Sequence, residues 1–211
     1  MTDSNGKNRE RKLMVVDLDG TLVDGNTLHI YLICGLKRLL RRGRIIKAAS
    51  IAGLITLRAV HAISHRTMKF GALKYIDESD KRLRDMFVSR VGKKVNIKVM
   101  ELIDQWHADG NQVLLATAAP ETYVSWIWHN DFLATPVEHN PERIEMRADV
   151  KADAVRVYAA ANKCNIDTIV TDHHDDLPLM KLARGSVYLV RPSAATMRHI
   201  NRQFGNIVIL S

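Results

Sequence analysis

Cysteine is scarce in this sequence, and this scarcity excludes some classes of protein. The two cysteines, Cys34 and Cys164, lie far apart and form no CxxC motif. A disulfide-stabilised secreted domain is therefore not expected, and neither is a metal site built from this pair alone. Residues 1–12 are polar and charged and lack the apolar core of a signal peptide, which predicts a loose lead-in to the first strand. These features favour a reduced, cytoplasmic protein.

Aromatic residues and long apolar runs are also scarce. Aromatic side chains make up 6% of the chain, and the most basic part has only Tyr31, Phe70 and Tyr75 before Phe87. Because nucleic-acid bases stack on aromatic rings, a nucleic-acid partner is not expected. In the apolar stretch at residues 45–60 the longest uncharged run is the ten residues from 48 to 57, which is too short to span a bilayer.

Acidic residues are nearly missing from one segment of the chain. Residues 26–98 hold 17 Lys and Arg against 4 Asp and Glu, a net charge of +13 in a chain whose total is +8. The rest of the chain is therefore acidic. This asymmetry indicates an anionic partner near residues 26–98, or else a solvated helical surface. Arg41, Arg42 and Arg44 crowd one stretch, and we expect them to strengthen the binding of anionic substrates.

The same segment, residues 26–98, contains no proline and is predicted to be helical. Apolar residues recur at helical intervals over residues 27–40, and residues 77–98 predict one or two further amphipathic helices. Residues 45–60 predict a buried helix of a small bundle, with a helix lying in a membrane interface as the alternative. His61 and His65 stand four residues apart, but no third ligand is evident, so both are interpreted as ordinary helix residues.

Strands and helices alternate from residue 99 onward. This alternation predicts a parallel sheet covered on both faces, whose ligands bind at the carboxyl ends of the strands. Residues 131–150 contain Pro136 and Pro141 and predict no clear element beyond a short hairpin. The expected strands are residues 13–16, 112–117, 166–171, 186–190 and 206–210, and the expected helices are 99–107, 120–129, 151–162, 177–183 and 194–203.

Polar residues stand at the ends of three predicted strands and at the start of one predicted helix. Asp17 and Asp19 come after the first strand, and Thr117 ends the strand QVLLAT. Lys151 opens a helix, and the cluster Asp172, Asp175 and Asp176 follows the strand IDTIVT. Two carboxylates side by side in a buried place repel each other, and Mg²⁺, which prefers oxygen ligands, removes that cost.

Taken in order, these clusters resemble the four motifs of the haloacid dehalogenase-like (HAD) superfamily. DLDGT resembles motif I, and LLATAAPETYV is similar to the motif II of phosphoserine-phosphatase-like members. VKADAV resembles motif III. VTDHHDDLPLM resembles motif IV, with Asp172 and Asp176 at the usual spacing and Asp175 as an extra acid. His173 stands where the family often has a small residue, and Thr171 where it often has glycine.

The resemblance implies a fold and a domain division. The fold would be α/β, a Rossmann-like three-layer α/β/α parallel sheet core with an inserted all-helical cap. Residues 13–25 and 99–211 would form the core. The basic residues 26–98 lie between motifs I and II, where the family inserts its C1-type cap.

The resemblance also implies a Mg²⁺-dependent phosphatase. Asp17 would attack the phosphoryl group and form an aspartyl-phosphate, and Asp19 would serve as general acid and then as general base. Thr117 and Lys151 would hold the phosphoryl oxygens. The magnesium ligands would be Asp17, Asp19 through its main-chain carbonyl and Asp172, with Asp176 as a ligand or as a residue that orients one.

The substrate and two rival functions stay open. Phosphoserine phosphatases carry an acid early in the cap that pairs with the substrate amine, whereas here Asp24 is followed by GNTLHIYL. A larger anionic ester is expected instead, with a phospholipid head group, a nucleotide or a sugar phosphate as candidates. The cap could then contact an anionic membrane surface, at the inner face of a membrane. The alternatives are a phosphotransferase or mutase, and a non-catalytic basic module that binds membrane or nucleic acid.

Overall fold

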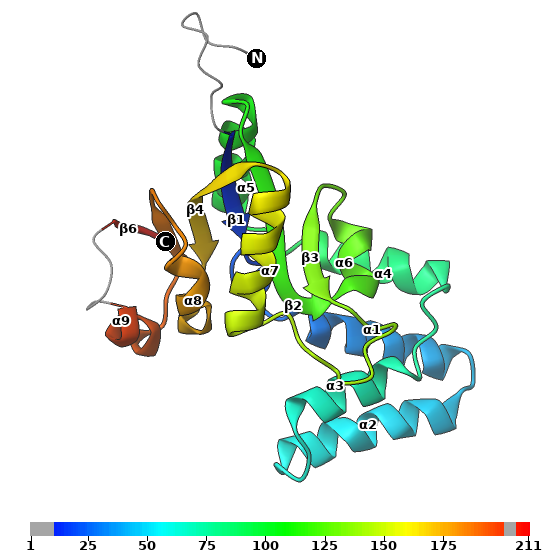
Figure 1. The fold of residues 1–211 in the computed structure, drawn as a ribbon. Coiled ribbons are helices and arrows are strands. Elements are labelled where there is room, and N and C mark those ends of the chain that lie inside the picture. Colours follow the sequence, from blue (N-terminus) through cyan, green and yellow to red (C-terminus); the bar gives the residue numbers. More distant parts are fainter. Residues whose placement is uncertain (1–10, 201–205) are drawn as a thin grey trace, which may run out of the picture.

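The computed structural model describes residues 11–200 and 206–211, and its centre is one parallel sheet (Figure 1). The six strands pair in the order β3-β2-β1-β4-β5-β6, every neighbouring pair being parallel. The chain therefore adds strands on one side of β1 up to β3, and on the other side from β4 onward. The strands are β1 (Arg11–Val16), β2 (Gln112–Pro120), β3 (Phe132–Thr135), β4 (Cys164–Thr171), β5 (Val187–Val190) and β6 (Ile207–Leu210).

Helices cover both faces of this sheet, which gives the three-layer α/β architecture predicted from the sequence. Side chains alternate along β1, so Met14 and Val16 enter one apolar core while Leu13 and Val15 enter the other. The core around Leu13 is closed by α7, α8 and α9, and the core around Met14 by α5, α6 and the inserted helices. These later helices are α5 (Ile97–Ala108), α6 (Glu121–Ile127), α7 (Ala148–Ala161), α8 (Leu177–Met180) and α9 (Ala194–Ile200).

A helical insertion lies between β1 and β2. It holds α1 (Thr27–Arg41), α2 (Ile45–Ala59), α3 (His65–Leu73) and α4 (Lys81–Gly92). The chain enters and leaves it along two adjacent segments, because Asp24 N donates to Lys94 O at 2.7 Å and Asn96 N donates to Leu22 O at 2.9 Å. The division at residues 25/26 and 98/99 stays a prediction.

An aromatic cluster ties the insertion to the sheet layer. Tyr31 of α1 and Phe87 of α4 pack against Tyr123 and Trp126 of α6, with ring centroids 4.8 to 6.0 Å apart. Aromatic side chains bury large apolar areas, so this cluster stabilises the insertion against the rest of the molecule. The insertion thus shares one continuous apolar core with one face of the sheet.

Several local expectations differ from the structure. Residues 131–150 form no hairpin, because β3 pairs with β2 in parallel and residues 136–147 then run without helix or strand. His61 is not on a helix with His65: it lies in a turn with φ 60°, and His65 begins α3. The helix expected at 177–183 ends at Met180. Of the expected lead-in, residues 11 and 12 belong to β1, and residues 1–10 lie outside the described residues, as do residues 201–203 of the last expected helix.

Asp80 joins two helices of the insertion, and its removal should destabilise the fold. Its carboxylate accepts from Arg38 Nε at 2.6 Å and from Arg42 Nη1 at 3.1 Å, and it caps the N-terminus of α4. Asp80→Ala loses both the cap and these pairs, so we expect the free energy of unfolding to fall by about 2 kcal/mol. Urea denaturation would measure this loss, with Asp85→Ala, an exposed acid on α4, as the matched control. Equal losses in the two variants would contradict the role of Asp80.

Candidate active site

The carboxyl ends of β1, β2 and β4 bring all the predicted site residues together. These strands are neighbours, and β1 and β4 flank the point where the strand order switches sides. Ligands of open α/β sheets bind outside the strand ends at such a point. The six predicted residues, Asp17, Asp19, Thr117, Lys151, Asp172 and Asp176, all line one cavity of about 380 Å³.

Lys151 is the buried centre of this site. It comes from the first turns of α7, has only 3% of its surface exposed, and lies between two carboxylates. Its Nζ is 2.8 Å from Asp17 Oδ1 and 2.8 Å from Asp176 Oδ1. Burial alone would lower the pKa of Lys151, but the two carboxylates outweigh it and raise that pKa. Lys151 is therefore held as a cation.

Contacts to both of its oxygens hold the Asp176 carboxylate in place beside Lys151. Its Oδ2 accepts a hydrogen bond from Thr171 Oγ1 at 2.7 Å and another from Lys151 Nζ at 3.0 Å. Both carboxylate oxygens thus have partners within the protein. Thr171 stands where the family that the motifs resemble often has glycine. Here its hydroxyl orients Asp176.

The two aspartates of the DLDGT loop have different surroundings. Burial raises the pKa of Asp17 to about 7, although the charge of Lys151 opposes this rise. Burial also raises the pKa of Asp19, against the hydrogen bond that Thr27 N donates to its Oδ1 at 2.6 Å. Asp17 is therefore paired with Lys151, the cation of the site. The carboxyl group of Asp19 instead lies at the start of α1, and it favours its protonated form more than a solvated aspartate does.

The oxygen atoms around Asp17 fit a divalent metal ion. Burial raises the pKa of Asp172 as it does those of Asp17 and Asp19, so the cavity holds more buried carboxylate than Lys151 can balance. A hard cation such as Mg²⁺ matches this donor set. Gly20, at φ +81°, lets the loop reach Asp172, because a Cβ there would lie 2.2 Å from Asp172 Oδ2. No residue other than glycine allows this approach.

Three charged residues that the sequence did not single out also line the cavity: Lys69 of α3, and Glu145 and Arg147 of the segment before α7. Lys69 is 2% exposed, and its Nζ is 2.7 Å from both Ala118 O and Glu145 Oε1. The insertion thus closes over the sheet edge through a buried ion pair. Little in the sequence indicated this ion pair, because Lys69 is one of many lysines in a basic segment.

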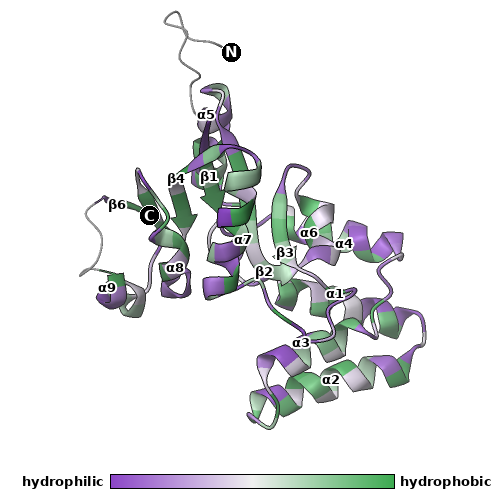
Figure 2. Ribbon diagram, viewed as in Figure 1, coloured by the Kyte–Doolittle hydropathy of each residue, from purple (hydrophilic) through white to green (hydrophobic). Residues whose placement is uncertain are grey.

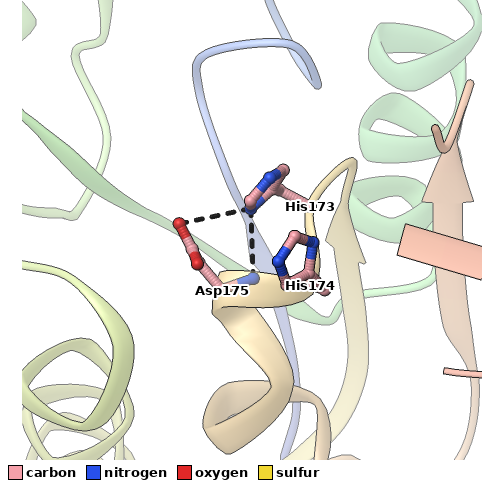
Figure 3. A group of neighbouring side chains, drawn as sticks. All are labelled: His173, His174 and Asp175. Atoms are coloured by element: carbon pink, nitrogen blue, oxygen red, sulfur yellow. Dashed lines mark hydrogen bonds and ion pairs between the residues drawn. The ribbon is translucent and has the colours of Figure 1, made fainter. Parts of the chain in front are cut away.

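The extra acid of the fourth motif, Asp175, belongs to a second polar group at the cavity edge. Figure 3 shows His173, His174 and Asp175 side by side, with His173 Nδ1 3.2 Å from Asp175 Oδ2. Arg147 also binds Asp175. Burial alone would raise the pKa of Asp175, but the hydrogen bond and charge of Arg147 outweigh it and lower that pKa. Asp175 thus balances Arg147.

The arginines expected to meet an anionic substrate lie elsewhere. Arg41 and Arg42 are at the end of α1 whose start holds Asp19, and Arg44 precedes α2; none of the three lines the cavity. Arg42 is also paired with Asp77 and Asp80. Net charge along the chain could not reveal this, because it does not say which end of a helix faces the site.

Fold and site together define an α/β enzyme in which carboxylates and one buried lysine meet at the switch point of a parallel sheet. The sequence model of the haloacid dehalogenase-like hydrolases matches residues 14–181, and the chain belongs to this family. No curated protein matches the chain by sequence.

Solved structures share this fold at low sequence identity. A protein of unknown function from Bordetella pertussis Tohama I has a TM-score of 0.73 at 16% identity, over 94% of this chain and 98% of its own. A HAD family hydrolase from Salmonella enterica has a TM-score of 0.61 at 12% identity, over 96% and 70%. A phosphoserine phosphatase, solved as a phospho-aspartyl intermediate analogue, has 0.59 at 12%, over 95% and 94%.

The raised pKa of Asp17 predicts a stability effect that depends on pH and metal. An acid whose pKa rises from 3.8 to about 7 on folding destabilises the folded chain increasingly as pH rises through that interval. In metal-free buffer at pH about 7.5, Asp17→Asn should therefore raise the free energy of unfolding by about 2 kcal/mol, and should change it little near pH 4.

Magnesium should reverse the order of stability of the unaltered protein and Asp17→Asn. Mg²⁺ should raise the melting temperature of the unaltered protein and should raise that of Asp17→Asn much less, because a ligand stabilises the state that binds it. Thermal melts with and without Mg²⁺ at the two pH values would measure both effects. Asp104→Asn, an exposed acid on α5, is the control. Parallel behaviour of the two variants would contradict a buried, metal-binding Asp17.

Proposed function

We propose that this protein is a Mg²⁺-dependent phosphatase that hydrolyses an anionic phosphate monoester through an aspartyl-phosphate at Asp17. The observation that carries this proposal is the buried Lys151 held between Asp17 and Asp176, with Asp19 two residues beyond Asp17. This arrangement offers a carboxyl nucleophile whose ionised form is favoured by Lys151, a cation for phosphoryl oxygens and a second buried carboxyl group with a raised pKa.

The first chemical step requires Asp17 to be ionised and Asp19 to be protonated. A carboxylate oxygen of Asp17 attacks phosphorus while the ester P–O bond breaks. Asp19, protonated, gives its proton to the leaving oxygen, so the product alcohol departs neutral. Lys151 and the hydroxyl of Thr117 bind the phosphoryl oxygens. Thr117 Oγ1 accepts from Ala119 N at 3.0 Å, which leaves its own proton for the substrate.

The second step releases phosphate. Asp19, now ionised, takes a proton from water, and the water oxygen attacks phosphorus as the bond to Asp17 breaks. In a phosphotransferase or mutase, the alternative, a sugar hydroxyl would replace water at this step. A similarly folded phosphoserine phosphatase solved as a phospho-aspartyl intermediate analogue supports the covalent route.

We infer that Mg²⁺ is held by the carboxylates of Asp17 and Asp172 and by the main-chain carbonyl of Asp19. When bound, it neutralises charge on the phosphoryl group. Asp176, also predicted as a ligand, has both oxygens engaged by Lys151 and Thr171. Its proposed role is therefore to position Lys151.

Substitution of the nucleophile tests this proposal. Asp17→Asn should abolish phosphate release from p-nitrophenyl phosphate, and Asp19→Asn should lower its rate by about 10²-fold or more, because general acid–base catalysis contributes that much. Phosphate release with Mg²⁺ would be measured on variants that melt cooperatively. An undiminished rate in Asp17→Asn would rule out the nucleophile assignment.

Lys69, which the insertion contributes to the cavity, suggests the class of substrate. Lys69 has three N–H donors, and Ala118 O and Glu145 use two of them. We propose that the third recognises a second anionic group of the substrate. Glu145 is already paired with Lys69, so recognition of a substrate amine is not favoured. A phospholipid head group, a nucleotide and a sugar phosphate that carries a carboxylate all satisfy this requirement, and a cytoplasmic location stays the expectation.

A matched pair of esters tests the role of Lys69. Lys69→Met should raise the KM for 3-phosphoglycerate by about tenfold, since a charged hydrogen bond is lost, and should change the KM for glycerol 3-phosphate much less. The two esters differ in a carboxylate and a hydroxymethyl group, so steady-state kinetics isolates the charge. Equal increases for both would show that Lys69 acts only through the fold.

A further inference from the structure

The helix α2 is apolar almost all round, yet it lies on the outside of the molecule. Its sequence is IIKAASIAGLITLRA, and only Ala48 and Ile51 are buried. It packs against α1 and α3 and runs along the lower edge of the insertion in Figure 1. Figure 2 shows it mostly green and white, in contrast to α4. A helix that is apolar over most of its circumference is normally buried in a core or in lipid.

Apart from Lys47, the exposed residues of α2 form one continuous surface without charge, which Val60 extends past the end of the helix. We call this surface the α2 outer face, and within it Ile46 is 84% exposed and Val60 is 65% exposed. At 100° per residue its members cover about half of the helix circumference, and none is charged. The α2 outer face consists of Ile45, Ile46, Ala49, Ala52, Gly53, Ile55, Thr56, Leu57, Ala59 and Val60. Exposed apolar patches of this kind mark interaction sites.

The charges beside this face are all of one sign. No Asp or Glu occurs between residues 25 and 76, and this stretch contains ten Lys and Arg. Arg38, Arg42 and Lys69 are paired with acids from outside the stretch. Among the described residues, five other basic side chains near the ends of α2 form no ion pair: Arg41, Arg44, Lys47, Arg58 and Arg66.

We propose that the α2 outer face docks onto an anionic lipid bilayer. An apolar helix face with unpaired basic side chains at its ends matches the acyl boundary and the negative head groups of such a surface. No helix of the described residues is long and apolar enough to cross a membrane, so α2 lies in the interface. This docking does not depend on the proposed phosphatase activity.

Two other occupants fit the face less well. A second copy would bring two sets of basic side chains together, with no acid on the face to balance them. A nucleic acid would meet aliphatic side chains where stacking needs aromatic rings. Of these three occupants, only an anionic bilayer matches both the apolar centre and the basic ends.

The docked helix would lie close to the mouth of the catalytic cavity. None of the α2 outer face lines that cavity, but His65, the first residue of α3, does. The turn at residues 60–64 therefore connects the docking helix directly to the cavity wall. Docking through α2 would bring the cavity to the lipid surface without blocking it.

Vesicle sedimentation of the full chain tests this proposal. We expect binding to phosphatidylcholine vesicles that contain phosphatidylglycerol, none to vesicles of phosphatidylcholine alone, and loss of binding at about 0.5 M NaCl. Ile46→Glu should weaken the binding by about tenfold or more, because it places a charge in the acyl boundary. Val157→Glu on α7, at a site 70% exposed, is the matched control and should bind like the unaltered protein.

Other results would overturn the proposal. Absence of vesicle binding by the unaltered protein would do so, as would equal weakening by Ile46→Glu and Val157→Glu. A dimer in sedimentation velocity that Ile46→Glu disrupts, without vesicle binding, would assign the face to a second copy. Retention on DNA without vesicle binding would assign it to nucleic acid. Thermal melts of both variants show whether the fold is intact, and phosphate release from p-nitrophenyl phosphate separates a docking defect from a catalytic one.

Discussion

The contact of one buried lysine with two buried aspartates is the constraint on which this structure depends. Lys151 reaches Asp17 at the end of β1 and Asp176 beyond the end of β4, so it links two neighbouring strand ends. Burial drives the carboxyl group of Asp17 toward its neutral form, and the charge of Lys151 opposes this. In the proposed mechanism, the same contact positions the nucleophile Asp17 beside the cation that binds the phosphoryl oxygens. The geometry of the sheet edge and the chemistry proposed for the site therefore rest on the same contacts.

Much of this could be predicted from the sequence, because the signals are local. The alternation of apolar strands and amphipathic helices predicted the parallel sheet, and polar residues just past strand ends predicted where Asp17, Thr117 and Asp172 meet. The part that could not be predicted depends on distant contacts. Pairing of Lys69 with Glu145 joins residues 76 positions apart. Residues 131–150 were expected to hold at most a short hairpin, whereas β3 forms a parallel edge strand by pairing with β2.

The helical insertion combines two different surfaces. Its inner side brings α3 with Lys69 to the candidate active-site cavity and shares an aromatic core with α6. Its outer side exposes the α2 outer face between unpaired basic residues. The sequence predicted α2 as a buried helix, with a membrane interface as the alternative, and the structure buries only two of its residues. Some basic side chains of the insertion therefore lie at the cavity, and others lie beside the α2 outer face.

The central claim is that Asp17 carries the phosphoryl group during turnover, and chemical trapping tests it most directly. Borohydride reduces an aspartyl-phosphate to homoserine, which peptide mass spectrometry identifies at a single position. The protein would be quenched with borohydride during turnover of p-nitrophenyl phosphate with Mg²⁺. The account predicts homoserine at position 17, and none when the ester is omitted. Reduction at Asp19 or Asp172 instead, or no reduced residue during active turnover, would contradict it.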